Sequence, residues 1–114
     1  MREITTQKLA KYFKITGEAI VKAKASPNRT SFDRSDFLDM IERYYSDASH
    51  FESKDDFVNA FAALNYAHGW LDAGARIGIF DVHDSRLFTV DDLWYTLKKY
   101  NNKVLTQEKI YKTT

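Results

Sequence analysis

The sequence predicts an all-α fold, an up-and-down three-helix bundle with an additional short C-terminal helix, in one domain spanning residues 1–114. Two observations support this prediction. Three long segments repeat apolar residues at the i, i+3, i+4 spacing of a helix with one buried face, and the connections between them are short. The only proline, Pro27, lies in SPNRT between the first two segments, where it marks a loop.

The first helix is expected at about residues 5–25. Lysines surround its other side, so we predict a surface helix with a Lys-rich outer face. Gly17 weakens a helix by about 1 kcal/mol relative to alanine, and we interpret it as the mark of a close helix crossing. The apolar face consists of Leu9, Tyr12, Phe13, Thr16, Ala19, Ile20 and Ala23.

The second helix, at about residues 32–52, has the clearest amphipathic pattern in the chain. Ser53, followed three residues later by Asp56, has the spacing of an N-cap with an acidic N3 residue, so a third helix is expected to begin almost at once. Helices joined so closely are antiparallel neighbours. The apolar side of the second helix holds Phe37, Leu38, Met40, Ile41, Tyr44, Tyr45, Ala48 and Phe51.

The third helix, at about residues 55–79, is apolar on nearly every side. Between Phe57 and Phe80 its only formal charges are Asp72 and Arg76, and many positions are Ala or Gly. Such a helix is expected to be buried all round. It is either the central helix of the domain or the seam of a self-associating pair, because small residues allow the close approach that either arrangement needs.

A fourth, short helix is expected at about residues 90–100. Thr89 with Asp92 repeats the capping pattern, and one face of the segment carries apolar residues. For residues 103–114 the pattern leaves open whether the chain forms another short helix or a frayed tail. The apolar face of the fourth segment consists of Val90, Leu93, Trp94, Leu97 and Tyr100.

The composition excludes several classes of protein. The chain has no cysteine, which removes disulfide frameworks, thiolate zinc sites and redox thiols. It shows neither a secretory signal nor an apolar run of membrane-spanning length. We therefore expect a cytoplasmic protein with no membrane partner. No phosphate-cradling loop or nucleophile motif is present, and we predict no cofactor.

Charge is unevenly distributed along the chain. Lys and Arg outnumber Asp and Glu by seven to two in residues 1–29 and by five to one in residues 93–114, whereas residues 30–92 hold five against thirteen. Basic ends can bind nucleic acid, or they can lie over the acidic middle and neutralise it. We favour neutralisation, because a nucleic-acid-binding domain has a basic excess overall and this chain has a net charge of only +1.

The candidate functional residues are Tyr66, His68, Trp70, Asp72 and Arg76, in the stretch NYAHGWLDAGARIG. His68 and Asp72 are one helical turn apart, so the carboxylate can orient the imidazole for acid–base chemistry, and Arg76 can clamp an anion. Alternatively, Asp72 satisfies His68 and pairs with Arg76 in a polar ladder that fixes how the helix packs, and we favour this structural role.

The second and third helices also carry histidines and aromatic residues that could bind a metal or a partner. No metal site is expected, because His50 and His68 are separated by roughly 15 Å along a helical hairpin. Tyr66 and Trp70 project away from the apolar sector. They are covered by the first helix or the C-terminal segment, or they form an exposed contact patch.

The segments RYYSDASHF and NYAHGWLDAGARIGIFDV resemble DUF357, a small archaeal family of unknown function, over about residues 35–90. The resemblance implies a cytoplasmic three-helix bundle, similar to spectrin-like or albumin-binding-like bundles, and implies no activity. The fourth helix goes beyond that pattern. The matching positions are Tyr45, Asp47, Ala48, Phe51, Ala60, Tyr66, Ala67, His68, Gly69, Trp70, Asp72, Ala73 and Arg76.

Three functions remain open. We favour a non-enzymatic protein-interaction or self-association module that uses the candidate patch, with a protein partner or a second copy of the chain bound there. The alternative is a small-molecule-binding or nucleotide-binding enzyme subunit that uses His68, Asp72 and Arg76. A weaker alternative is nucleic-acid binding through the basic ends.

Overall fold

The structure, a computed structural model, describes residues 3–89 and contains three α-helices: α1 (Thr6–Ala25), α2 (Arg34–Ser53) and α3 (Phe57–Ile77). The described residues contain no strand, so the prediction of an all-α fold is confirmed. Each helix begins one or two residues later than its sequence pattern indicated. The helix expected at residues 90–100 and the tail at residues 103–114 lie outside the described residues.

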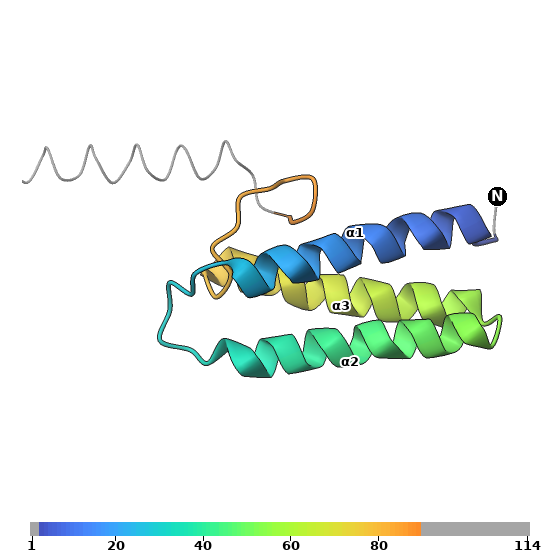
Figure 1. The fold of residues 1–114 in the computed structure, drawn as a ribbon, viewed down its shortest axis with the longest axis horizontal. Coiled ribbons are helices and arrows are strands. Elements are labelled where there is room, and N and C mark those ends of the chain that lie inside the picture. Colours follow the sequence, from blue (N-terminus) through green and yellow to red (C-terminus); the bar gives the residue numbers. More distant parts are fainter. Residues whose placement is uncertain (1–2, 90–114) are drawn as a thin grey trace, which may run out of the picture.

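The three helices run alternately up and down, and α3 lies between α1 and α2 (Figure 1). The chain then leaves α3 and returns beside α1 as an irregular segment, residues 78–89, drawn in orange at the end of the coloured chain. Two backbone hydrogen bonds join the start of this segment to the loop between α1 and α2: Arg29 N–H donates to Gly78 O at 2.9 Å and Asp81 N–H to Pro27 O at 3.0 Å. None of the described helices is long and apolar enough to cross a membrane.

A side chain caps the N-terminus of every helix. Thr5 accepts from the Lys8 N–H, Asp33 from Ser35 and Asp56 from Asn59, which satisfies backbone donors that have no partner inside the helix. The prediction that Ser53 caps the third helix is wrong. Ser53 ends α2, and its hydroxyl donates to the His50 carbonyl.

The backbone of the turn between α2 and α3 explains why Ser53 does not cap α3. Asp55 adopts a φ of +55°, which reverses the chain after α2 has ended. Asp56 thereby becomes the first residue whose carboxylate reaches an N–H in the first turn of α3. Ser53 and Asp56 do have the spacing of an N-cap and an N3 residue, but Asp56 is itself the N-cap of α3.

The core consists of two clusters along α3. The larger cluster lies at the C-terminal end of α3 and includes Leu71, Ile79 and Phe80, each with no exposed surface. The smaller cluster joins Leu9 of α1 to Leu64 of α3. Burying such side chains supplies about 1.5–3 kcal/mol each, which holds α1 and α2 against α3.

Within residues 3–89, α3 is not buried all round as predicted, because one side of it is exposed. α1 and α2 cover only part of its circumference, and no other described segment covers the remaining sector. A stripe of mostly apolar residues is therefore exposed along its length. This stripe, called the outer face of α3 from here on, consists of Val58, Ala62, Asn65, Tyr66, Gly69, Ala73 and Ile77.

Glycine allows two close approaches in this bundle. A Cβ on Gly17 of α1 would lie 3.0 Å from the Tyr45 hydroxyl of α2, so this glycine does mark a close crossing. A Cβ on Gly74 of α3 would lie 2.5 Å from two carbons of the Phe80 ring. Gly74 therefore provides the space into which Phe80 packs after the chain has turned at Gly78.

We expect opposite effects from Gly→Ala substitutions at two positions of α3. Gly74→Ala should lower the free energy of unfolding by about 1–2 kcal/mol, because crowding against Phe80 outweighs the gain in helix propensity. Gly69→Ala should raise it by up to about 1 kcal/mol, since nothing lies within 4 Å of its added Cβ. Urea denaturation in dilute solution measures both, and two changes of the same sign would contradict this packing.

Candidate functional site

The five candidate residues all lie on α3, but they do not form one site. His68, Asp72 and Arg76 line a hollow of about 460 Å³ together with residues 85–89. Tyr66 and Trp70 line a different hollow of about 600 Å³ on the outer face. The helix thus presents a polar surface, which holds the returning segment, and an apolar surface, which no described residue covers.

The His68 imidazole connects three segments of the chain. Its Nε2 lies 2.5 Å from the Leu87 carbonyl, which can only accept, so Nε2 carries a proton and donates. In the neutral ring, Nδ1 then accepts from the Thr16 hydroxyl of α1 at 3.0 Å. Both ring nitrogens are therefore occupied within the fold, and this geometry leaves neither nitrogen free to exchange a proton with a substrate.

Asp72 anchors the end of the returning segment. Its two carboxylate oxygens accept from the Thr89 backbone N–H at 2.7 Å and from the Thr89 hydroxyl at 2.8 Å. The His68 Nε2 lies farther away, 3.9 Å from the Asp72 carboxylate. Arg76 is exposed and forms no hydrogen bond or ion pair within the described part of the chain. The proposed ladder of His68, Asp72 and Arg76 is therefore replaced by bonds to Thr16, Leu87 and Thr89.

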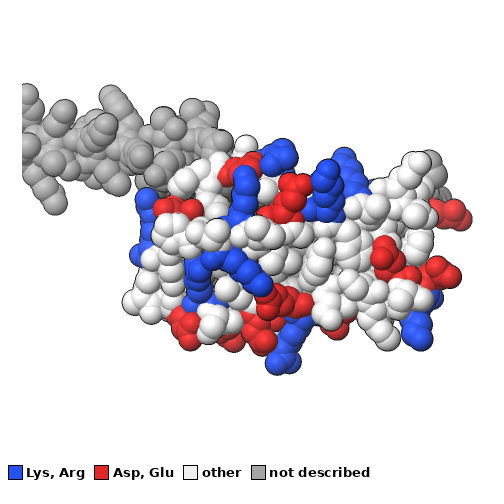
Figure 2. All heavy atoms as spheres, in the orientation of Figure 1, with Lys and Arg blue, Asp and Glu red and all other residues white. Residues whose placement is uncertain are grey.

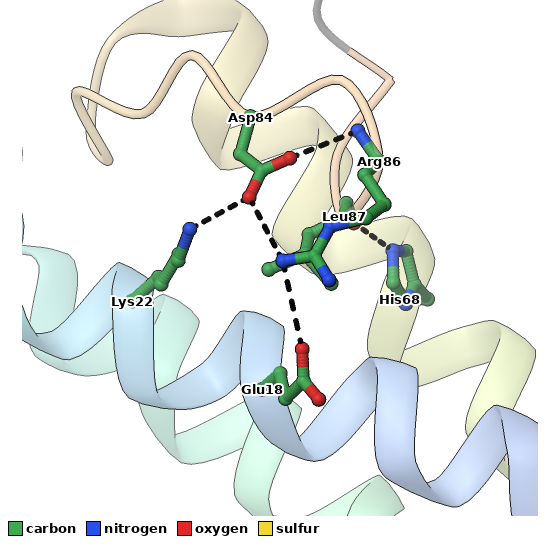
Figure 3. Close-up of polar contacts among 6 residues, drawn as sticks. All are labelled: Glu18, Lys22, His68, Asp84, Arg86 and Leu87. Atoms are coloured by element: carbon green, nitrogen blue, oxygen red, sulfur yellow. Dashed lines mark hydrogen bonds and ion pairs between the residues drawn. The ribbon is translucent and has the colours of Figure 1, made fainter.

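A second polar cluster holds the middle of the returning segment (Figure 3). Asp84 accepts from the Lys22 ammonium of α1 at 2.6 Å and from the Arg86 backbone N–H at 3.0 Å. The Arg86 guanidinium lies 3.3 Å from Asp84 and 3.8 Å from Glu18 of α1. Because Lys22 donates to it, the pKa of the Asp84 carboxyl falls from 3.8 to about 2.

The contact between Lys22 and Asp84 predicts how the stability contributed by the Asp84 carboxylate depends on pH. A folded pKa below the unfolded value means that the stabilisation is complete above about pH 4 and is lost as the pH falls through about 2. Lys22→Met should raise the pKa of Asp84 towards 3.8, because the largest cause of its lowering is removed. Carboxyl NMR titration checks this, and an Asp84 pKa unchanged by the substitution would contradict the assigned contact.

A further prediction concerns the anchor at Asp72. Asp72→Ala should free the end of the returning segment, so the Thr89 amide should exchange with solvent about tenfold faster or more, the equivalent of losing about 1.4 kcal/mol. Asp47→Ala is the matched control, because Asp47 is exposed on α2. Equal Thr89 exchange rates in the two variants would show that Asp72 does not hold the segment.

The residues that complete these contacts could not be predicted from sequence spacing. Thr16 was interpreted as part of an apolar face, and it is indeed buried, with 1% of its surface exposed. Its hydroxyl nevertheless faces His68. The Leu87 carbonyl and the Asp84 carboxylate come from a segment without periodicity, so no spacing rule could place them near α3 or α1.

The outer face of α3 has a different character. Its hollow is lined by Ala62, Asn65, Tyr66, Gly69, Trp70 and Ala73. Tyr66 is 62% exposed and stacks against Tyr44 with ring centroids 5.1 Å apart. Trp70 is half-buried, edge-on to Phe37 at 5.0 Å. Both aromatic residues thus pack against α2, and neither is covered by α1. The C-terminal segment, which was the other cover expected for them, lies outside the described residues.

Charged side chains of both signs are interspersed on the face drawn in Figure 2. Basic residues of the first segment pair with acidic residues of the middle segment: Lys22 with Asp84, Lys24 with Glu42 and Arg29 with Asp81. Such pairs fit the interpretation that the basic start of the chain neutralises the acidic middle. Within residues 3–89, no three His, Asp or Glu side chains are grouped as a metal ion requires.

Comparison with known proteins bears on these same elements. No curated protein and no solved structure matches the chain at a significant level. A family model described as "Protein of unknown function (DUF357)" matches residues 11–80, from the first turns of α1 through α2 and α3 to Phe80. The match covers more than half of the chain and includes His68, Asp72 and the outer face of α3, so the chain belongs to the DUF357 family, as its sequence segments indicated.

Proposed function

We propose that this protein is a self-association module whose docking surface is the outer face of α3, and that the occupant is the same face of a second copy. One observation supports the proposal above all others: the central helix of the bundle exposes an apolar stripe, with Tyr66 62% exposed, where a helix in a closed domain has a core contact. His68 and Asp72 serve the internal packing of α3 and do not take part in docking.

The chemistry of the stripe favours a copy of itself. From Val58 to Ile77 the exposed side of α3 carries a single charge, that of Arg76 near its C-terminal end, so most of two such faces would meet without burying unpaired charges. Small residues at Ala62, Gly69 and Ala73 allow the backbones of two helices to approach closely. A two-fold interface also requires that each contact between residues i and j occurs twice.

An antiparallel pair of α3 helices meets that requirement. With the two-fold axis between Gly69 and Trp70, Tyr66 of one copy faces Ala73 of the other, and Ile77 faces Ala62. Each large side chain then lies opposite a small one, which is the arrangement that fills an interface without voids. The aromatic residues in the centre are of the type that contributes most to association.

The other two functions have less support. An enzyme that uses His68 needs a free ring nitrogen, and both nitrogens are bonded within the fold. Nucleic-acid binding needs free cations, and Lys22 and Lys24 of α1 are paired with acidic residues, which leaves Lys11 and Lys14 as exposed cations of this helix. The proposal includes a cytoplasmic location, and the protein partner in it is the second copy of the chain.

Matched Ala→Glu substitutions test the proposal by sedimentation velocity over a range of concentrations. Ala73→Glu places a charge in the centre of the proposed interface, whereas Ala10→Glu adds the same group to the exposed side of α1. We expect the wild-type chain and Ala10→Glu to form dimers, and Ala73→Glu to remain monomeric with its helical content intact. A wild-type chain that is monomeric at every concentration, or an Ala73→Glu chain that still dimerises, would overturn the proposal.

A further inference from the structure

We propose that Asp36 and Arg43 of α2 select the partner and set its orientation: in the docked pair, Asp36 of each copy lies opposite Arg43 of the other. This inference rests on the proposed function, because it concerns how a second copy binds across the outer face of α3. Three features support it: the side of α2 on which the two residues lie, their level along the bundle, and their opposite charges.

Asp36 and Arg43 lie on the side of α2 that faces the same way as the outer face of α3. Tyr44 marks the border between the two surfaces, because its ring stacks on Tyr66. At 100° per residue, Asp36 and Arg43 lie about 80–100° around α2 from Tyr44 in one direction. Tyr45 lies about 100° around in the other direction, where its ring packs against α1. The two charged residues are therefore on the side of α2 that α1 does not cover, and both are exposed.

A second copy that binds the outer face of α3 also meets this side of α2. The helices α2 and α3 lie side by side as a hairpin (Figure 1). In the antiparallel pair the two-fold axis runs across the helices, so α3 faces α3 and α2 faces α2, and two hairpins form a four-helix bundle. Met40, which is half-buried, lies between Asp36 and Arg43 along α2 and supplies an adaptable apolar side chain at the centre of the α2 contact.

The level of the two residues along the bundle brings opposite charges together. Tyr44 and Tyr66 are level with each other because their rings stack. The proposed axis lies three to four residues after Tyr66, so in the antiparallel α2 it lies three to four residues before Tyr44. Asp36 is then about 7 Å from the axis on one side and Arg43 about 4 Å from it on the other. The two-fold rotation exchanges the sides, so Asp36 of one copy and Arg43 of the other differ in level by roughly 3 Å, which an arginine side chain spans.

Both residues are available for this contact in the single chain. Asp36 forms no hydrogen bond or ion pair within residues 3–89. The Arg43 guanidinium lies 3.0 Å from the Asp39 carboxylate one turn earlier on α2, and 74% of the Arg43 side chain is exposed. An exposed pair of this kind contributes little to stability. Docking therefore gives Asp36 a cation at little cost, and the two-fold symmetry makes the contact twice.

The two contacts distinguish one orientation from the other. An apolar stripe alone accepts a parallel or an antiparallel copy. In a parallel pair the α2 helices lie at opposite edges of the interface, so Asp36 and Arg43 meet no counterpart on the other copy. Charged pairs at the margin of an interface contribute more to specificity and orientation than to affinity. Asp36 and Arg43 thereby make this chain selective for a second copy of itself in the antiparallel orientation.

Charge reversal in two separate variants tests the contact by sedimentation velocity of the full chain. Asp36→Arg places two cations together at each contact and Arg43→Asp places two carboxylates together, so each variant alone should self-associate about tenfold more weakly. An equimolar mixture of the two variants, with a fluorescent label on one, should form heterodimers with nearly the wild-type affinity. Both contacts of the heterodimer again join opposite charges.

Lys11→Asp is the matched control, because it changes the net charge by as much as Arg43→Asp and lies on the exposed side of α1. It should dimerise as the wild type does, and its mixture with Asp36→Arg should not recover the wild-type affinity. If the wild type dimerises and the two reversed variants dimerise as tightly, or if their mixture gains nothing, this inference is overturned and the proposed function stands. A wild-type chain that stays monomeric at every concentration would overturn the proposed function and this inference with it.

Discussion

Phe80→Ala should lower the free energy of unfolding by about 3–5 kcal/mol, the largest stability effect expected in this protein. Phe80 has no exposed surface, and it lies against the bare backbone of Gly74. Its backbone N–H also donates to the Gly74 carbonyl at 3.2 Å, which holds the main chain of Phe80 against the end of α3. Alanine would leave a cavity that the surrounding helices can fill only in part.

Phe32→Ala is the matched control for this substitution. Phe32 lies in the loop between α1 and α2 and is 65% exposed. Its loss should change the free energy of unfolding by no more than about 0.5 kcal/mol. Chemical denaturation followed by circular dichroism measures both variants. Similar losses at Phe32 and Phe80 would mean that residues 78–89 do not dock as described.

His68→Ala should destabilise the fold by about 2–4 kcal/mol and leave self-association of the folded chain unchanged. The substitution removes the hydrogen bond to the Leu87 carbonyl and leaves the buried Thr16 hydroxyl without its partner. It also removes packing between α1, α3 and the returning segment. Because the outer face of α3 lies on a different side of the helix, its contacts do not depend on the imidazole.

His50→Ala on α2 controls for the loss of a histidine, because His50 is exposed. We expect it to change the free energy of unfolding by no more than about 0.5 kcal/mol. Denaturation and sedimentation measured on both variants separate the two roles. A stable His68→Ala chain that fails to dimerise would contradict the division of α3 into a structural side and a docking side.

The helices could be predicted from the sequence because their patterns are local. Apolar periodicity marked α1, α2 and α3 to within two residues, and the short connection before α3 marked its antiparallel neighbour. The capping residue of α3 was misassigned, because Ser53 and Asp56 both have side chains that can cap a helix. Only the positive φ of Asp55 selects between them, and the sequence does not specify it.

The candidate residues were predicted as one site on the third helix, and the structure divides them between two sides of α3. From the sequence spacing we predicted that His68 lies beside Asp72 and that Asp72 pairs with Arg76. The actual partners, Thr16, Leu87 and Thr89, come from α1 and from the irregular returning segment. Long-range contacts of this kind leave no periodic signal. For the same reason, composition alone could not show which side of an almost uniformly apolar helix would remain uncovered.

The proposed self-association through the outer face of α3 is tested most directly by disulfide cross-linking. The chain has no cysteine, so a single Gly69→Cys substitution supplies the only thiol. An antiparallel pair with its axis beside Gly69 brings the two sulfurs within bonding reach, whereas Ala62→Cys places them far apart. The account predicts rapid formation of a covalent dimer by Gly69→Cys and slow formation by Ala62→Cys. Equally rapid cross-linking of both would indicate a parallel pair, and slow cross-linking of both would contradict association through this face.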